Sequence, residues 1–236
     1  MSDDSRLILY KLKFDDGHTI EFPIHLDKAT NDFLAVLPEP APSWIALECH
    51  QCSNCPLSTL SVPRCPVAAN LLPLIELCGA MVSYQSVHMD VYTPERCISA
   101  NTTAQRVLSS ILGLVIATSP CPHTEHFKPM ARFHLPLASE DETIYRTSSM
   151  YLLAQHFLYK DGKAYSLDLD GLRKIYAEMQ VINRALANRL RTAISQDAAV
   201  NGIILLDLLT QSVTWSIEDG LDNLRYLFKP YGVGAN

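Results

Sequence analysis

The sequence lacks any apolar run long enough to cross a bilayer. Its longest apolar stretches are ILGLVIA and GIILL, whereas a membrane-spanning helix needs about 20 residues. The N-terminal residues MSDDSRLILYKLKF are acidic and then alternate, which is unlike a signal peptide. These features predict a soluble, cytoplasmic protein with no membrane partner.

Basic residues and familiar enzyme motifs are also scarce. Lys and Arg total 19 against 25 Asp and Glu, which gives a net charge of −6. No run of Lys or Arg compensates locally, so we expect no binding to nucleic acid. The sequence contains no G-x-S-x-G, P-loop, dinucleotide fingerprint or H-E-x-x-H motif. Hydrolase, NTPase, nicotinamide-dependent and zincin activities therefore lack their usual sequence signals.

Cysteine, in contrast, is concentrated in one short stretch. ECHQCSNCPLSTLSVPRCP contains Cys49, Cys52, Cys55 and Cys65, with the spacing C-x2-C-x2-C-x9-C. Two-residue gaps let neighbouring thiolates turn toward one point, and the longer gap lets a loop return a fourth ligand. In a reducing compartment, such a density argues against disulfides. We therefore expect a tetrathiolate site for zinc or an iron–sulfur cluster, the alternative being buried thiols that only pack.

The spacing bears on which metal and which further ligands are involved. It resembles the ferredoxin run C-x2-C-x2-C-x3-C-P, although the last gap here is nine residues. This slightly favours a [4Fe–4S] cluster over zinc. Cys121, in SPCPHTEHF, is a remote ligand that can replace one of the four, and His123 and His126 are weaker candidates. Cys78 and Cys97 lack partners at ligand spacing and are interpreted as packing residues.

The hydrophobic pattern predicts an α+β fold, with a mixed N-terminal half that carries the cysteine loop and a helical C-terminal half. Residues 6–26 alternate around Asp15-Asp16-Gly17, which is typical of a β-hairpin. A boundary near residue 140 divides a cysteine-rich metal-binding region, 1–140, from a helical region, 141–236, packed against it as one unit. Further strands are expected at 44–47 and 81–92, and helices at 66–78, 101–118, 143–158, 198–209 and 221–228. A long helix is expected to start at Asp168 or Asp170 and to run to 194.

Two groups of arginines allow further interpretation. The segment with Arg132 and His134 either lines a ligand pocket or is an ordinary connector whose arginine pairs with nearby carboxylates. The connector is the favoured interpretation. Arg184, Arg189 and Arg191 of the long predicted helix are interpreted as its solvated face.

Several strings together resemble a family of uncharacterised bacterial cysteine-rich proteins. They are ECHQCSNCPL, CPVAANL, SPCPH and MARFHLPLA, spread over about residues 44–140. The resemblance implies a bacterial cytosolic protein in which the cysteine loop and the SPCPH corner belong to one unit. It implies no activity.

Three functional hypotheses follow. The first is a metalloprotein with a sensory, redox or accessory role, in which the four clustered cysteines are ligands and Cys121 is a substitute. The second is an enzyme whose site lies between the cysteine loop and the region of Cys121, His123, Arg132 and His134. The third is an interaction module with structural zinc, whose helical half binds an unidentified protein partner or a second copy in a homodimer.

Overall fold

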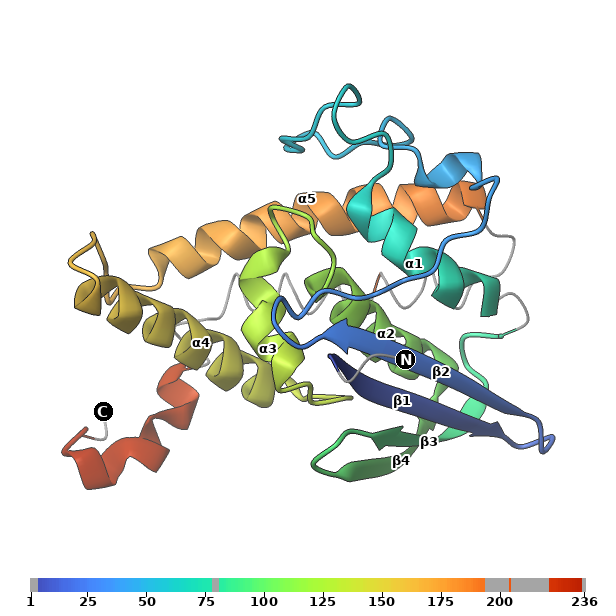
Figure 1. Cartoon of the computed structure of the whole chain (residues 1–236). Helices are drawn as coiled ribbons and strands as arrows, with labels where there is room; N and C mark the ends of the chain where they lie inside the picture. Colours follow the sequence, from blue (N-terminus) through green and yellow to red (C-terminus); the bar gives the residue numbers. More distant parts are fainter. Residues whose placement is uncertain (1–3, 78–80, 194–203, 205–220, 235–236) are drawn as a thin grey trace.

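The computed structural model describes residues 4–77, 81–193, 204 and 221–234 (Figure 1). A four-stranded antiparallel sheet is combined with helices, so the predicted α+β class is confirmed. Within these residues, no helix is both long and apolar enough to cross a membrane. The strands are β1 (Ser5–Phe14), β2 (Thr19–Asp27), β3 (Ser86–Tyr92) and β4 (Cys97–Thr103). The helices are α1 (Pro66–Leu77), α2 (Ala104–Ala117), α3 (Lys128–Arg132), α4 (Glu140–Lys160) and α5 (Asp170–Ala193), with short 3-10 helices at Ser43–Ile45, Glu125–Phe127 and Arg225–Tyr231.

The sheet has the order β2-β1-β3-β4 and buries one of its faces. Strands β1 and β2 form the predicted hairpin, and its turn contains Gly17 at φ 88°, a conformation that glycine adopts without strain. Tyr10 in β1 pairs with Phe22 of β2 and with Val91 of β3. All three side chains are buried, as the two-residue period of a half-buried strand requires. Strand β1 is therefore held by a neighbour on each side.

Helices α1 and α2 lie between this sheet and the long helix α5, and the cysteine loop lies at the far side of α5 from the sheet (Figure 1). The main hydrophobic cluster includes side chains of β1, β2, β3, α1, α2 and α5, among them Ile24, Leu71, Leu112 and Leu186. Residues on both sides of position 140 thus share one core. This arrangement brings the start of α1 and one side of α2 toward α5, where both cavities described below are formed.

The structure corrects two of the predicted elements. Residues 44–47 are not a strand: a 3-10 helix covers Ser43–Ile45, and only an isolated bridge joins Ala46 to Arg64. Residues 97–103, part of which was assigned to a helix, form β4 instead, so α2 begins at Ala104. Strand β4 contains no strongly apolar alternation, and its pairing with β3 decides its conformation.

The remaining helical predictions agree with the structure where it describes them. Helix α1 runs through Pro73 without interruption, and α4 and α5 cover the two long C-terminal segments that were expected. Residues 221–224 are helical and lead into the 3-10 helix Arg225–Tyr231. The helix expected at 198–209 falls almost wholly outside the described residues.

Helix α4 begins with a capping box. The Glu142 N–H donates to Ser139 Oγ at 3.2 Å, and the Ser139 N–H donates to Glu142 Oε2 at 2.7 Å. Two of the four unpaired N–H groups at the start of the helix are satisfied in this way. The cap fixes the first turn of α4, which carries residues of the larger cavity.

Replacing Ser139 with alanine should lower the free energy of unfolding by about 1 kcal/mol, because the Glu142 N–H loses its acceptor. Urea denaturation monitored by circular dichroism measures the change. Ser149→Ala is the matched control, since Ser149 is exposed within the same helix and alanine there is neutral or slightly stabilising. Equal losses in the two variants would contradict a role for the cap.

Candidate functional site

Four cysteines line one small cavity of about 20 Å³: Cys52, Cys55, Cys65 and Cys121. Two come from the loop, where the Cys55 N–H donates to the Cys52 carbonyl at 3.0 Å. Cys65 lies just before α1, and its N–H donates to the Ile45 carbonyl at 2.8 Å. Cys121 lies in a turn after α2, closed by the Thr124 N–H, which donates to its carbonyl at 2.9 Å. Three separate segments of the chain thus bring their thiols to one place.

The cavity also contains a buried cation, Arg189 of α5, whose exposed fraction is 2%. Its Nη1 donates to the Trp44 and Ala46 carbonyls, both at 2.6 Å, and its Nη2 donates to the Leu47 carbonyl at 3.3 Å. Among the described residues, no carboxylate forms an ion pair with it. The expectation that Arg189 belongs to a solvated face is therefore wrong, because the helix turns this residue toward the segment before the cysteine loop.

Burial raises the pKa of the Cys52 thiol to about 12, and the neighbouring Cys65, Cys55 and Cys121 contribute through charge repulsion. The charge of Arg189 acts in the opposite direction. Burial also raises the pKa of Cys121. Without a bound cation these two thiols hold their protons at neutral pH, so any metal that binds them must displace protons.

The other candidate ligands lie elsewhere or have other partners. Cys49 is not among the residues that line the cavity. His123 does line it, but its Nε2 lies 2.8 Å from the Asn54 carbonyl oxygen. His126 is exposed in a 3-10 helix. Cys97 is exposed on β4 and so is not the packing residue expected, and Cys78 lies outside the described residues.

As the described side chains stand, no group of three or more His, Cys, Asp or Glu is arranged to hold a metal ion. The four thiols surround the cavity rather than converging on a single point.

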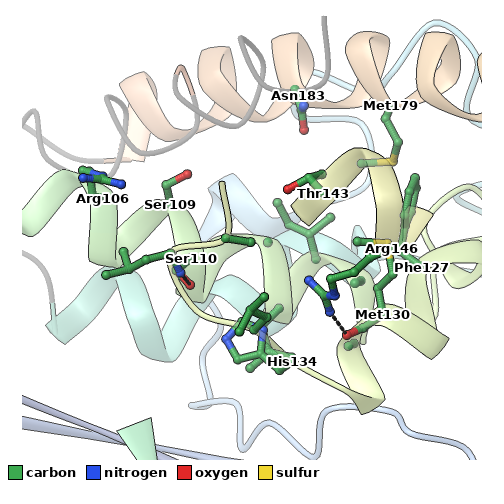
Figure 2. Close-up of a pocket in the computed structure, with 18 of the residues that line it drawn as sticks. Arg106, Ser109, Ser110, Phe127, Met130, His134, Thr143, Arg146, Met179 and Asn183 are labelled. Carbon is green, nitrogen blue, oxygen red and sulfur yellow. Dashed lines mark hydrogen bonds between the residues drawn. The ribbon is translucent and has the colours of Figure 1, made fainter. Parts of the chain in front are cut away.

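A second and much larger cavity, about 410 Å³, lies between α2, α4, α5 and the segment that follows α3 (Figure 2). Its wall includes Leu114 and Ile116 of α2, Phe127, and Met179 of α5. Polar groups are few and come from several elements, including Ser110, His134, Thr143, Arg146 and Asn183. A mostly apolar cavity of this size with a few polar side chains is typical of a small-molecule site.

One polar edge of this cavity is connected to the sheet. Tyr10 Oη of β1 lies 2.5 Å from His134 Nε2 and 3.2 Å from Ser110 Oγ of α2. The Leu137 N–H also donates to Ser110 Oγ, at 3.3 Å. Burial lowers the pKa of His134 to about 3, and the charge of Arg146 contributes to the shift. His134 is therefore a neutral imidazole at physiological pH.

Arg146 of α4 is a half-buried cation that lines this cavity. Its Nη2 donates to the Met130 carbonyl at 3.0 Å, the dashed contact in Figure 2, and to the Phe133 carbonyl at 2.8 Å. Burial lowers its pKa, and the Glu142 carboxylate one turn earlier partly offsets this effect. No sequence signal predicts this position for Arg146, because an arginine in a polar helix resembles any solvated charge.

The structure places the residues of the predicted enzyme site in three different parts of the molecule. Cys121 and His123 line the cysteine cavity, whereas His134 lines the larger one. Arg132 is exposed and its Nη1 lies 3.9 Å from the Glu95 carboxylate. These residues therefore do not form a single catalytic constellation.

Comparison with known proteins gives a family without an assigned activity. A family model described as "Domain of unknown function (DUF6901)" matches residues 8–229. The chain belongs to this family. DUF6901 covers both cavities, which agrees with the resemblance of the sequence to an uncharacterised family. No curated protein and no solved structure matches the chain.

Acid should destabilise the fold through His134. The unfolded chain binds a proton at this imidazole near pH 6.5 and the folded protein only near pH 3, so stability falls as the pH is lowered between these values. The slope contributed by one such group is at most about 1.4 kcal/mol per pH unit. Urea denaturation at several pH values should show a flatter profile for His134→Gln than for the parent protein.

His156→Gln is the control for this experiment, since His156 is exposed on α4. It should retain the parent pH profile. A His134→Gln profile that coincides with the parent between pH 6.5 and pH 4 would show that His134 titrates normally.

Proposed function

We propose that this chain is a metalloprotein whose metal is held by the thiolates of Cys52, Cys55, Cys65 and Cys121. One observation carries the proposal: cysteines from three segments of the chain line one cavity that also contains a buried guanidinium. Thiols that only pack have no need to share a cavity, whereas ligands do.

The charge balance of the cavity supports thiolate ligands. Arg189 is enclosed and its contacts among the described residues are neutral carbonyl groups. A buried cation without a counter-charge is costly. Four thiolates around a divalent ion or a [4Fe–4S]²⁺ core leave a net charge of −2, which the guanidinium partly neutralises. Metal loading therefore stabilises both the thiolates and the arginine.

A [4Fe–4S] cluster is the first candidate for the metal. Cys52 and Cys55 are separated by the two-residue gap of a ferredoxin-like sequence, and Cys65 is followed by proline, as is the last cysteine of that sequence. Four cysteines line a common space, and four is the number of thiolate ligands that a cubane cluster takes. An oxidisable cluster gives the protein a redox or sensory role.

A single zinc ion is the second candidate. The cavity of about 20 Å³ has room for about one water-sized sphere before any rearrangement, which favours a single ion. Zinc bound by four thiolates leaves no open coordination position. Its role would be to fix the cysteine loop onto α5 as a structural element of an interaction module.

Anaerobic purification followed by metal analysis and visible spectroscopy tests the proposal. A cluster gives about four iron atoms with acid-labile sulfide and broad visible absorption, and zinc gives about one ion in a colourless protein. Cys65→Ser and Cys121→Ser should each lower the metal content by most of its value, because serine is a poor replacement for a thiolate.

Cys49→Ser and Cys97→Ser are the matched controls and should retain the metal, since neither residue lines the cavity. Loss of metal in Cys49→Ser with retention in Cys121→Ser would contradict the ligand assignment. Metal-free parent protein, after anaerobic purification and after reconstitution with iron and sulfide or with zinc, would overturn the proposal.

A further inference from the structure

We infer that the larger cavity binds a small organic carboxylate with an apolar body, and that Arg146 is the residue that recognises the carboxylate. The inference concerns the site between α2, α4 and α5 and is independent of the cysteine cavity. It rests on the size, the charge and the distribution of polar groups in the wall.

The size and composition of the cavity define the body of the ligand. Its volume of about 410 Å³ is within the range that small-molecule sites usually have. Leucine, isoleucine, phenylalanine, methionine and alanine side chains make up half of the lining residues, and they come from α2, α3, α5 and the segments on either side of α3. Water interacts weakly with such surfaces. An apolar chain or ring that displaces this water gains about 25 cal/mol of binding free energy for each Å² of apolar surface buried.

The charge of the wall defines the head group. Arg106 and Arg146 line the cavity, and among the described lining residues there is no aspartate or glutamate. Arg106 is exposed at the start of α2, whereas Arg146 is half-buried. Within the described chain, no carboxylate lies within ion-pair distance of Arg146, although Glu142 is one turn away. An anionic ligand supplies the missing counter-charge.

The geometry of Arg146 leaves it able to bind such a ligand. Both of its hydrogen bonds to carbonyl groups come from one nitrogen, Nη2. These bonds hold the guanidinium in place, and Figure 2 shows it directed into the cavity toward His134. No hydrogen bond from Nη1 or Nε to another described residue is present. A planar guanidinium with one edge fixed and further donors available suits a carboxylate.

The neutral side chains next to Arg146 fit the same head group. His134 is uncharged, so it offers the carboxylate a polar group without adding a charge to the site. Thr143 lies one turn before Arg146 on α4 and also lines the cavity. The charged end of the ligand therefore lies at the α4 side, and its apolar body extends between α2 and α5.

Isothermal titration calorimetry with three probes of equal chain length tests the inference: decanoate, decanol and decylammonium. Decanoate should bind the parent protein at least about tenfold more tightly than decanol, because it adds a charge-assisted hydrogen bond to the same apolar burial. Decylammonium should bind more weakly than decanol. Equal affinity for the three probes, or no binding of decanoate at millimolar concentration, would overturn the inference.

Single-residue variants distinguish recognition of the carboxylate from a general effect on folding. Arg146→Gln should weaken decanoate binding about tenfold or more and leave decanol binding unchanged, and Arg146→Lys should retain part of the preference for decanoate. Ala138→Phe fills the cavity and should abolish binding of both probes. Arg184→Gln, on the exposed side of α5 and outside the cavity, should bind as the parent does.

A purely structural role for Arg146 gives a different result. Its loss would then weaken decanoate and decanol equally, and this outcome would refute carboxylate recognition by Arg146. If Arg146→Gln does not fold, the comparison of the three probes on the parent protein and on Arg146→Lys still decides the matter.

Discussion

The guanidinium of Arg189 connects the longest helix to the chain segment that leads into the cysteine loop. Its bonds to the carbonyl groups of Trp44, Ala46 and Leu47 replace backbone pairing that a strand would have provided there. An enclosed arginine is costly unless its donors are satisfied, and these three carbonyl groups satisfy donors of Arg189. The bonds fix the position of residues 44–47 relative to α5, next to the cavity that the thiols line.

Helix α5 serves both cavities through adjacent stripes of its surface. Met179 and Asn183 face the larger cavity, whereas Ile182, Leu186 and Arg189 face the cysteines. Because residues three and four positions apart lie on one side of a helix, a small rotation of α5 would change both linings together. The two cavities thus share helix α5 without sharing a lining residue.

The sequence was informative where a local pattern decides the structure. The hairpin around Gly17 and the long amphipathic helices followed from periodicity and turn chemistry. Strand β4 and the 3-10 helix at Ser43–Ile45 did not, because pairing with β3 and bonding to Arg189 determine them. The same applies to the sites: the cysteine spacing indicated a cluster, but only the fold shows that Cys121, and not Cys49, lines the cavity. For Arg146 no local pattern existed.

The central position of β1 has a consequence for the larger cavity. Tyr10 is held by hydrogen-bonded strands on each side, and it contacts both His134 and Ser110. The polar edge of the cavity is therefore fixed by the sheet ladder and is preorganised, so little conformational entropy is lost there when the cavity is filled.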